Sequence, residues 1–321
     1  MGGDQPSCGS QGRYISNVKL VIAVVSHDAG GAQILSSWLR RCREPYCLVL
    51  DGPAKEIFRK KCGSKPIISL HEAITLCDWV LCGTSWQSKI ERRAIALAKS
   101  EGKKVVAFLD HWVNYRERFQ EKNVAVLPDE IWVVDVDAEK MAKANFPELP
   151  VVLKANPYFE DLQIELGKVQ ITPKDSDECS ALYVCEPIRE HAQLQHGDER
   201  FWGYTEEDAL KYFIKNIGAV GINLTTIKIR PHPSEGKNKY DWARQAGRLT
   251  IEIGGGRALL EEIMEADVVV GCASMAMVVG LLAKKRVICS IPPGGRMCAL
   301  PQKGIEHLQV LVSNQKSFLN A

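Results

Sequence analysis

Short apolar runs and longer amphipathic segments alternate along most of the chain. This pattern is typical of parallel βα units, in which helices cover both faces of a buried sheet. In the first half, the apolar runs predict strands at 19–26, 47–51, 79–82, 104–109, 130–134 and 151–153. In the second half, they predict strands at 181–185, 226–230, 249–253, 268–271 and 286–290. The predicted fold class is therefore α/β, with two Rossmann-like parallel-sheet domains.

A polar stretch separates the two sets of strands. Residues 163–179, QIELGKVQITPKDSDEC, do not continue the alternation and are predicted to form a linker. The N-terminal domain would then cover residues 18–162 and the C-terminal domain residues 180–321. Residues 1–17 are rich in Gly, Ser, Gln and Asp without an apolar core, which predicts a disordered tail and not a signal peptide.

One sequence pattern occurs in both halves. The segments 72–85, EAITLCDWVLCGTS, and 261–274, EEIMEADVVVGCAS, each predict a helix, an Asp, a strand and then a Ser seven positions after the Asp. Two halves built on one plan are one interpretation, and a pattern that all βα units share is the other. Ligands of such sheets bind at the carboxyl ends of the strands, so two facing domains would place their loops across one cleft.

Composition and charge exclude several other classes of protein. The formal net charge of +2 argues against a dedicated binder of nucleic acid or anionic membranes, since such proteins concentrate Lys and Arg. The longest uncharged run, 268–283, is shorter than the ~20 apolar residues of a transmembrane helix, so no integral membrane segment is predicted. Eleven cysteines without a signal peptide indicate free thiols in a reducing, cytoplasmic compartment.

No spacing of metal ligands is visible in the sequence. No C-x-x-C pair occurs, and His191 and His196 are five residues apart, which does not place two ligands on one helix face. Asp135 and Asp137 in VVDVDAEK are interpreted as strand-end and cap residues, not as a D-x-D metal dyad. We therefore expect no metal site.

The first candidate site element follows the first predicted strand, in VVSHDAGGAQILSSWL. Gly30 and Gly31 let the backbone approach a ligand closely, and the helix that follows offers unpaired N–H groups to a phosphate or a sugar hydroxyl. His27 and Asp28 are candidate catalytic groups at the same turn. The alternative is a close-packed turn with Asp28 as the helix N-cap.

The second candidate element is FLDHWVNYRERF, residues 108–119. Its strand ends in Asp110 and His111, and either side chain is a candidate general base. Aromatic and Arg side chains in a loop at a strand end, including Arg116, suggest contacts with a base, a sugar or a phosphate. The alternative is an aromatic loop that packs against the other domain.

The second half contains two candidate anion-binding elements. In IKIRPHPSE, two prolines stiffen the strand exit and fix the directions of Arg230 and His232, which suits them to hold an anion. In ADVVVGCASMAMVVGLLAKKRVI, Ser274 is placed as the N-cap of a buried helix. Its hydroxyl and the next backbone N–H groups, beginning at Met275, form a natural seat for a pyrophosphate.

Two further loops are candidates to line the site. Three glycines around Gly255 precede a predicted helix and could close over the cleft. Residues 185–213 predict a long loop, rich in charged and aromatic side chains, that contains Glu190 and His191. A helix is predicted to begin after Thr205.

The RPHPSE strand end, the segment EADVVVGCASMAMVVGLLAKKRVI and the two Rossmann-like halves together resemble the sugar-nucleotide glycosyltransferases of the GT-B fold. The nearer parallels are bacterial capsule polymerases and sialyl- or glycerophospho-transferases, and the non-hydrolysing sugar-nucleotide 2-epimerases share the fold. The resemblance implies that His232 and Ser274 contact the donor phosphate in the C-terminal domain, and that Asp28 or Asp110 of the acceptor-side N-terminal domain is the base. The Glu that many such transferases carry after the Ser motif is absent from 275–283.

These features predict a metal-independent glycosyltransferase that moves a sugar or polyol phosphate from a nucleotide-activated donor to an acceptor hydroxyl. Arg230, His232 and Ser274 would stabilise the leaving phosphate electrostatically. A sugar-nucleotide epimerase or hydrolase is the alternative enzyme, and a non-catalytic nucleotide-sugar-binding protein is the alternative from another class. The nucleotide sugar is expected as a substrate, with no tightly bound cofactor. Proteins of this fold class commonly form homo-oligomers, although no heptad or exposed apolar stripe indicates one here.

Overall fold

The computed structural model describes residues 20–85, 88–121, 124–170, 178–236, 238–245 and 249–319. The tail expected at 1–17 lies outside these residues. The chain folds into two compact units. The first contains the residues up to 110 together with 114–133 and 142–153, and the second contains 111–113, 134–141 and the residues from 154 onward.

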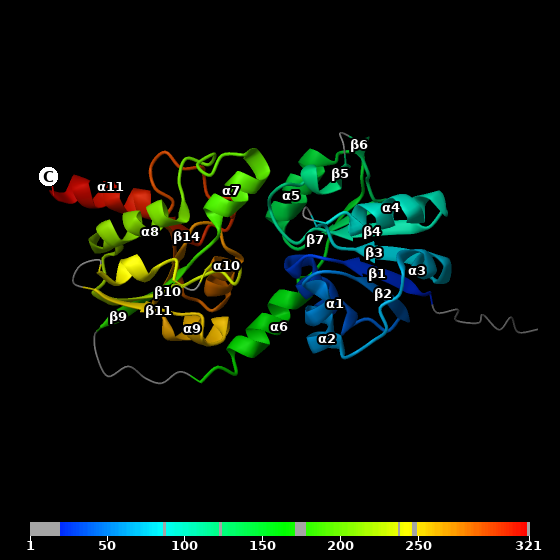
Figure 1. Ribbon diagram of the computed structural model, residues 1–321, viewed down its shortest axis with the longest axis horizontal. Helices are drawn as coiled ribbons and strands as arrows, with labels where there is room; N and C mark the ends of the chain where they lie inside the picture. The colour runs from blue at the N-terminus through cyan, green and yellow to red at the C-terminus, as the bar shows by residue number, and fades with distance from the viewer. Residues whose placement is uncertain are drawn as a thin grey trace, which may run out of the picture. The chain divides into compact units, whose positions relative to one another are not determined.

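The first unit is built on a six-stranded parallel sheet with the order β2-β1-β3-β4-β7-β8 (Figure 1). Its strands are β1 (Ile22–Ser26), β2 (Tyr46–Leu50), β3 (Trp79–Cys82), β4 (Lys104–Phe108), β7 (Glu130–Val133) and β8 (Val151–Leu153). A short antiparallel pair, β5 (Gln120–Glu121) and β6 (Val124–Ala125), follows the 3₁₀ helix η1 (Glu117–Phe119). Every residue of β1 is buried, as expected for a central strand covered on both faces.

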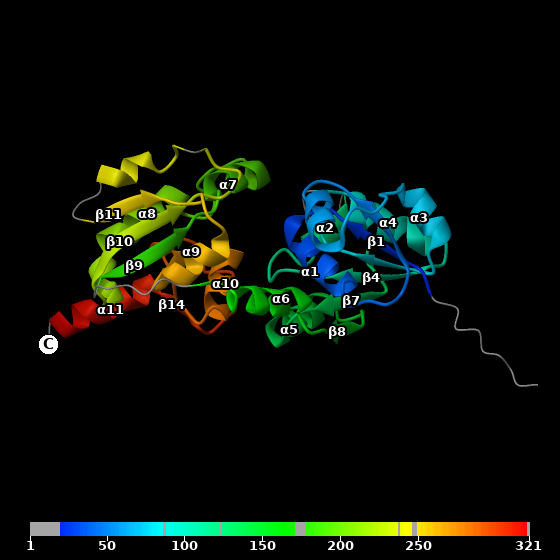
Figure 2. The same ribbon diagram turned by 90° about the horizontal axis from the view of Figure 1, so that it is seen from below.

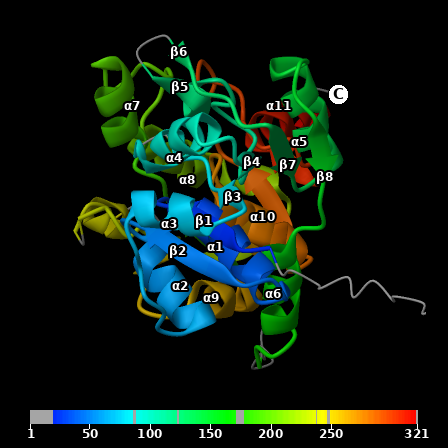
Figure 3. The same cartoon turned by 90° about the vertical axis from the view of Figure 1, so that its right-hand side faces the viewer.

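Helices cover both faces of this sheet (Figure 3). One pair of helices is α1 (Ala29–Leu39) and α2 (Ala54–Cys62), which pack against each other. The other pair is α3 (Leu70–Leu76) and α4 (Ile90–Ser100), on the opposite side of the strands. The helix α5 (Val136–Asn145) follows β7, and its residues 136–141 belong to the second compact unit. This doubly wound arrangement agrees with the predicted α/β class.

The second unit also contains a six-stranded parallel sheet, with the order β11-β10-β9-β12-β13-β14. Its strands are β9 (Cys179–Val184), β10 (Leu224–Arg230), β11 (Thr250–Ile253), β12 (Val268–Gly271), β13 (Arg286–Cys289) and β14 (Ile305–His307). Its helices are α6 (Pro157–Leu166), α7 (Ile188–His196), α8 (Glu206–Lys215), α9 (Leu259–Glu265), α10 (Met275–Leu282) and α11 (Leu308–Leu319). The 3₁₀ helices η2 (Ile217–Val220) and η3 (Asp241–Gln245) complete the unit.

The core of the second unit lies between the sheet and α8, α11, η2 and η3. Leu210 and Phe213 of α8, Tyr240 beside η3 and Leu308 of α11 are buried against strand residues such as Ile227. The opposite face of the sheet is covered by α9 and α10, which contact each other (Figure 2). Both faces are therefore buried, which explains the continuous apolar runs in the sequence.

Three strand starts are fastened by the same pair of hydrogen bonds. In each, an Asp just before one strand accepts from a backbone N–H at the start of the neighbouring strand, and its own N–H donates to the carbonyl there. The pairs are Asp78 with Val21, Asp129 with Val105, and Asp267 with Ser180, at N···Oδ2 distances of 2.7, 2.8 and 2.8 Å. The Asp129 pair lies outside the two echoed segments. The Asp that residues 72–85 and 261–274 have in common is therefore explained by a pair of hydrogen bonds that another two neighbouring parallel strands also make.

All eleven predicted strands are present, with ends that differ by at most three residues. β14 was not predicted, because it is only three residues long and contains Glu306 between Ile305 and His307. The prediction of a long loop at 185–213 is wrong, because α7 forms within it. The helix predicted after Thr205 is confirmed, and it begins with a capping box between Thr205 and Asp208. The expected linker, 163–179, begins within α6, and residues 171–177 lie outside the described part of the chain.

The ten cysteines in the described residues are all free thiols. Cys82, Cys185, Cys272 and Cys289 are buried, as expected for thiols inside strands and strand ends. Among the described residues, none of the helices has the length and apolar character to cross a bilayer.

Candidate functional site

In the first unit, Arg118 connects the loops at the carboxyl ends of β3 and β4. Its Nη1 lies 2.7 Å from Asp110 Oδ1, and it donates to the carbonyl oxygen of Thr84 at 2.6 Å and to its hydroxyl at 3.0 Å. The side chains of Arg118 and Asp110 are only 6% and 11% exposed. Because a buried ion pair is costly to break, this contact fixes the position of Asp110. The sequence analysis selected Arg116, which is exposed, and missed Arg118, two residues further on.

The glycine pair at the start of α1 is packed against the protein's own groups. An added Cβ on Gly30 would lie 2.0 Å from Asp110 Oδ2, and one on Gly31 would lie 3.5 Å from the Cα of Gly83. The carboxylate of Asp110 therefore approaches the N-terminal end of α1, where an anion is electrostatically favoured. A role of Gly30 and Gly31 in binding a substrate phosphate stays a prediction.

His27 and Asp28 form a side-chain pair at the carboxyl end of β1. His27 Nδ1 lies 2.6 Å from Asp28 Oδ1, and both side chains are about one-fifth exposed. Asp28 is the N-cap residue of α1 by its backbone, but its side chain does not cap the helix. Since an ionised carboxylate only accepts hydrogen bonds, Nδ1 is the ring nitrogen that donates to Asp28. Gly52 lies over this ring, because a Cβ there would be 2.6 Å from Nε2.

Glu91 lies beneath this pair and was not identified from the sequence. Its Oε1 accepts from the His27 backbone N–H at 2.8 Å, while its Oε2 is buried without a hydrogen-bond partner. Burial raises the pKa of Glu91 to about 7, and the nearby charge of Asp28 raises it further. Glu91 is therefore a group that titrates near neutral pH directly behind the candidate base.

The aromatic loop after β4 is packed inside the protein. Trp112 and Tyr115 are buried, and the Trp112 indole donates to Asp135 Oδ2 at 3.0 Å. Asp135 also accepts from the Ala138 N–H at 2.7 Å and so caps α5, whereas Asp137, the residue interpreted as a cap, lies in the first turn of the helix. His111 is half-buried, and its Nδ1 accepts from the Trp112 backbone N–H at 2.9 Å. The aromatic rings are therefore not presented to solvent for stacking on a base.

In the second unit, Ser274 is the N-cap of α10, as predicted. Its hydroxyl oxygen accepts from the Ala276 N–H at 3.2 Å, and the helix begins at Met275. The preceding turn is held by Glu186, whose Oε2 accepts from the Ala273 N–H at 2.7 Å. Burial raises the pKa of Glu186. Glu186 follows directly after the strand-end residue Cys185, a position that the sequence analysis did not select.

Arg230 is already paired within the protein. Its Nη1 lies 2.5 Å from Glu262 Oε2, and Glu262 is buried. The other oxygen of Glu262 accepts from the Gly255 N–H at 2.9 Å, so one carboxylate holds both the β10 exit and the glycine turn before α9. The binding of a donor phosphate by Arg230 stays a prediction, and it would have to compete with this contact.

His232 and His191 are electrostatic neighbours in the second unit. Burial lowers the pKa of both rings, and the charge of His232 lowers the pKa of His191 further. His232 Nδ1 lies 2.7 Å from the Ser234 hydroxyl, and its backbone N–H donates to Glu235 at 2.7 Å. His191 and Glu190 lie on α7 and not on a loop, because residues 188–196 form a full helical segment.

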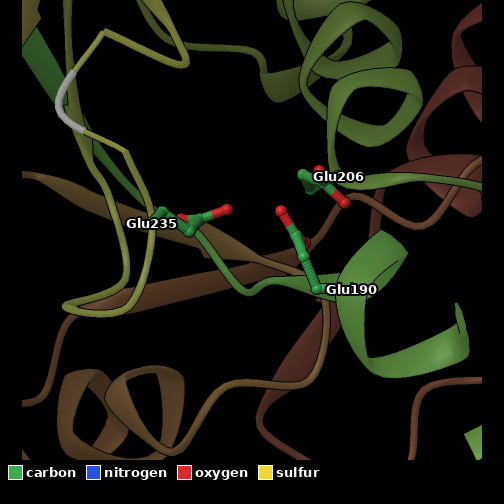
Figure 4. A group of neighbouring side chains, drawn as sticks. All are labelled: Glu190, Glu206 and Glu235. Carbon is green, nitrogen blue, oxygen red and sulfur yellow. The ribbon is translucent and has the colours of Figure 1, made fainter. Parts of the chain in front are cut away.

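A lysine contacts all three members of a group of glutamates close to His232. The ligand atoms of Glu190, Glu206 and Glu235 lie within 4.8 Å of one another, and their carboxylates point toward a common centre (Figure 4). Lys239 Nζ lies 2.8, 2.6 and 2.9 Å from these three side chains. Burial alone would lower the pKa of Lys239, but the three hydrogen bonds outweigh it and raise this pKa. The ammonium group therefore offsets part of the negative charge of this cluster.

Comparison with known proteins gives structural relatives without sequence relatives. No protein-family model and no curated protein sequence matches the chain. The UDP-GlcNAc 2-epimerase from Methanocaldococcus jannaschii is similar with a TM-score of 0.59 at 11% identity, over 94% of this chain and 93% of that one. The UDP-GlcNAc 2-epimerase from Neisseria meningitidis, solved with UDP-GlcNAc, is similar with a TM-score of 0.57 at 12% identity, over 94% and 92%.

A glycosyltransferase structure is also similar to this chain. The glycotransferase of kitacinnamycin matches with a TM-score of 0.50 at 11% identity, over 90% of this chain and 86% of that one. Together with the two parallel six-stranded sheets, these matches identify the architecture. The chain has the α/β fold of the UDP-GlcNAc 2-epimerases and the GT-B glycosyltransferases.

Proposed function

We propose that this protein acts on a nucleotide-activated sugar and transfers the sugar, or a polyol phosphate, to an acceptor hydroxyl. The observation that carries the proposal is the Ser274 cap at the carboxyl end of β12. There the first N–H groups of α10 have no partner within the helix, and the dipole favours an anion. The Ser274 hydroxyl accepts from Ala276 and keeps its own proton to donate to a phosphate oxygen.

His232 is the second donor contact in this proposal. Its neutral ring can donate one hydrogen bond to a phosphate oxygen, and protonation on binding an anion would strengthen that contact. Glu186 supports the proposed phosphate-binding site at Ser274 indirectly, because it accepts a hydrogen bond from the Ala273 N–H and so fixes the turn that precedes Ser274. Negative charge that develops on the leaving nucleotide would be stabilised by these groups.

His27 is the proposed general base, positioned by Asp28. The 2.6 Å contact between them leaves Nε2 to take the proton of an acceptor hydroxyl. Asp110 is less suited to this role, since its Oδ1 is held by Arg118 in a buried ion pair. The proposed step requires no metal ion. Turnover that is lost with a chelator and restored by Mn²⁺ would contradict this part of the proposal.

Epimerisation of the nucleotide sugar is the second candidate. It is supported by the similarity to two UDP-GlcNAc 2-epimerases with TM-scores of 0.59 and 0.57. Transfer needs an acceptor, whereas epimerisation changes the sugar without one. The two candidates can therefore be separated by whether an acceptor is required.

The first experiment is a thermal-shift screen with UDP, CDP, CMP, GDP and their sugar conjugates. A ligand at 100 times its dissociation constant stabilises the folded state by about 2.7 kcal/mol, which gives a clear shift. We expect a shift with one nucleotide family that is lost in His232→Ala and kept in the control His307→Ala, on the outer strand β14. The absence of a shift with every nucleotide would contradict the proposal.

The second experiment follows the sugar of the bound nucleotide by NMR with and without acceptor mixtures. Nucleotide release that depends on an acceptor and is lost in Asp28→Asn supports transfer. A new sugar isomer without an acceptor identifies an epimerase, and free nucleotide without an acceptor identifies a hydrolase. Binding without turnover in the parent protein would identify a non-catalytic binding protein.

A further inference from the structure

Two cysteines meet at one backbone carbonyl in the second unit. Cys289, at the end of β13, and Cys298, in the loop that follows, each donate a hydrogen bond to the carbonyl oxygen of Cys272 at 3.2 Å. Their sulfur atoms therefore cannot be further apart than twice this distance. A short movement of the loop is enough to bring the sulfur atoms to bonding distance.

The surroundings of the two thiols differ in a way that assigns them different roles. Cys289 is buried, whereas Cys298 is partly exposed beside Met297, whose side chain is 90% exposed. The interaction with Cys289 lowers the pKa of Cys298, against the effect of burial. The pKa of Cys289 is raised by its interaction with Cys298 and by burial. Cys298 is thus the accessible nucleophile and Cys289 the protected partner.

We propose that Cys298 and Cys289 are a modification site at which peroxide forms an internal disulfide. The Cys298 thiolate attacks one oxygen of hydrogen peroxide, the O–O bond breaks, and a sulfenic acid and a hydroxide ion result. Cys289 then loses its proton and attacks the Cys298 sulfur, and the S–O bond breaks with release of water. In sum, two thiols and one peroxide give one disulfide and two waters.

The disulfide would act on the loop that carries Arg296. The Arg296 N–H donates to the Trp202 carbonyl at 2.9 Å, and its guanidinium lies 3.9 Å from the centre of the Trp202 ring. The charge of Arg296 acts on Glu186, which holds the turn before Ser274. Cys298 is two residues from Arg296, so drawing Cys298 onto Cys289 displaces Arg296 from this position.

Tryptic digestion gives a direct test on the intact protein. Cleavage after Arg286, Arg296 and Lys303 yields the peptides VICSIPPGGR and MCALPQK, each with one of the two cysteines. After hydrogen peroxide and alkylation of the remaining thiols, we expect these two peptides to be joined, and to separate on reduction. Sulfoxide formation at Met297 reports that peroxide reached the loop. Oxidised Met297 together with two alkylated cysteines, or with a Cys298 sulfinic acid as the main product, would overturn the proposal.

Single variants test the order of the two steps. In Cys289→Ser, Cys298 should stop at a sulfenic acid that dimedone traps. In Cys298→Ser, Cys289 should stay alkylatable after unfolding, because it is buried. Cys42→Ser is the matched control and should form the disulfide normally, since the pKa of Cys42 is raised to about 11 by burial and Glu44 and no described thiol hydrogen-bonds to it. Equal oxidation of Cys289 without Cys298 would contradict the assigned roles.

The effect on ligand binding rests on the proposed function. The oxidised protein should bind the nucleotide found in the thermal-shift screen about fivefold or more weakly, and reduction should restore the affinity. Cys289→Ser should show no such change. If the reduced protein binds no nucleotide, the proposed function fails, while the joined peptides still decide whether the disulfide forms. Unchanged affinity after complete disulfide formation would overturn the coupling through Arg296.

Discussion

The two sheets share the same hydrogen bonds at the starts of their strands but differ in the contacts made at the carboxyl ends of their strands. Asp78 and Asp267, each just before a strand, make the same pair of hydrogen bonds to the start of the neighbouring strand. Seven residues later the two segments differ. Ser85 is buried and accepts from the Ser88 N–H, whereas Ser274 caps α10 and is partly exposed.

The contacts at the strand starts stabilise the fold, whereas the strand ends are where a binding site can form. Strand starts carry hydrogen bonds that every parallel pair can use, so the same residue type recurs there. Strand ends carry the loops from which α/β proteins build their sites. In the first unit a buried Arg118–Asp110 pair occupies this edge, and in the second unit a partly exposed helix N-terminus does.

The largest expected effect comes from breaking the first unit's ion pair. Arg118→Ala leaves the Asp110 charge buried without its partner, so the free energy of unfolding should fall by about 3–5 kcal/mol. Urea denaturation measures this loss. The control is Arg59→Ala, which breaks an exposed pair with Glu56 and should leave the midpoint unchanged. Equal midpoints for Arg118→Ala and the parent would show that this strand edge does not depend on the ion pair.

The next effect is a pH dependence located in the first unit. The pKa of Glu91 is raised from 4.5 to about 7 in the folded protein, so the folded state keeps a proton that the unfolded chain has released. Its contribution to stability is present below pH 4.5 and is lost as the pH rises to about 7. Glu91→Gln should remove this loss, worth about 3 kcal/mol across the window.

The Glu91 measurement compares urea midpoints of variant and parent between pH 4.5 and 8. The difference between Glu91→Gln and the parent should grow with pH and level off above about 7. Glu101→Gln, at the exposed end of the same helix α4, is the control and should follow the parent at every pH. A difference that is constant with pH would contradict a raised pKa at Glu91.

The smallest expected effect on stability comes from the two corresponding serines, Ser85 and Ser274, and these should differ in their effect on nucleotide binding. Ser274→Ala removes a helix cap and Ser85→Ala removes a buried hydrogen bond, so each should lower the free energy of unfolding by about 1 kcal/mol. Only Ser274→Ala should weaken the binding of nucleotide, measured by titration calorimetry. Equal loss of affinity in both variants would mean that the effect is a general one on stability.

Sequence reasoning predicted the strands of this protein well because their pattern is local. Continuous apolar runs identify buried parallel strands whatever their neighbours are, and β14 was missed since it is short and contains Glu306. The caps at Ser274 and Thr205 were predicted for the same reason, because a cap involves residues within one turn. The prediction of a long loop at 185–213 was wrong, because the many charged residues in this stretch did not indicate the helix α7.

The candidate site depended more on tertiary structure. His27 and Asp28 are adjacent in the sequence and were identified there as candidate catalytic groups, and the Ser274 cap was predicted, but the contact between His27 and Asp28 was not. Arg118 and Glu186 were not visible, because each acts on a residue from another part of the chain. Glu186 reaches Ala273 across 87 positions, and no local pattern encodes such a contact.

The sequence by itself thus determined the alternation of strands and helices, the division into two sheets and the places where helices begin. Those properties follow from periodic burial and from hydrogen bonds within a few residues. Tertiary structure decided which charges are paired, so that Asp110 and Arg230 are already held by Arg118 and Glu262, while His27 contacts Asp28 through Nδ1. The physical reason is that the partner of a buried charge is selected by distance in space, which chain order does not specify.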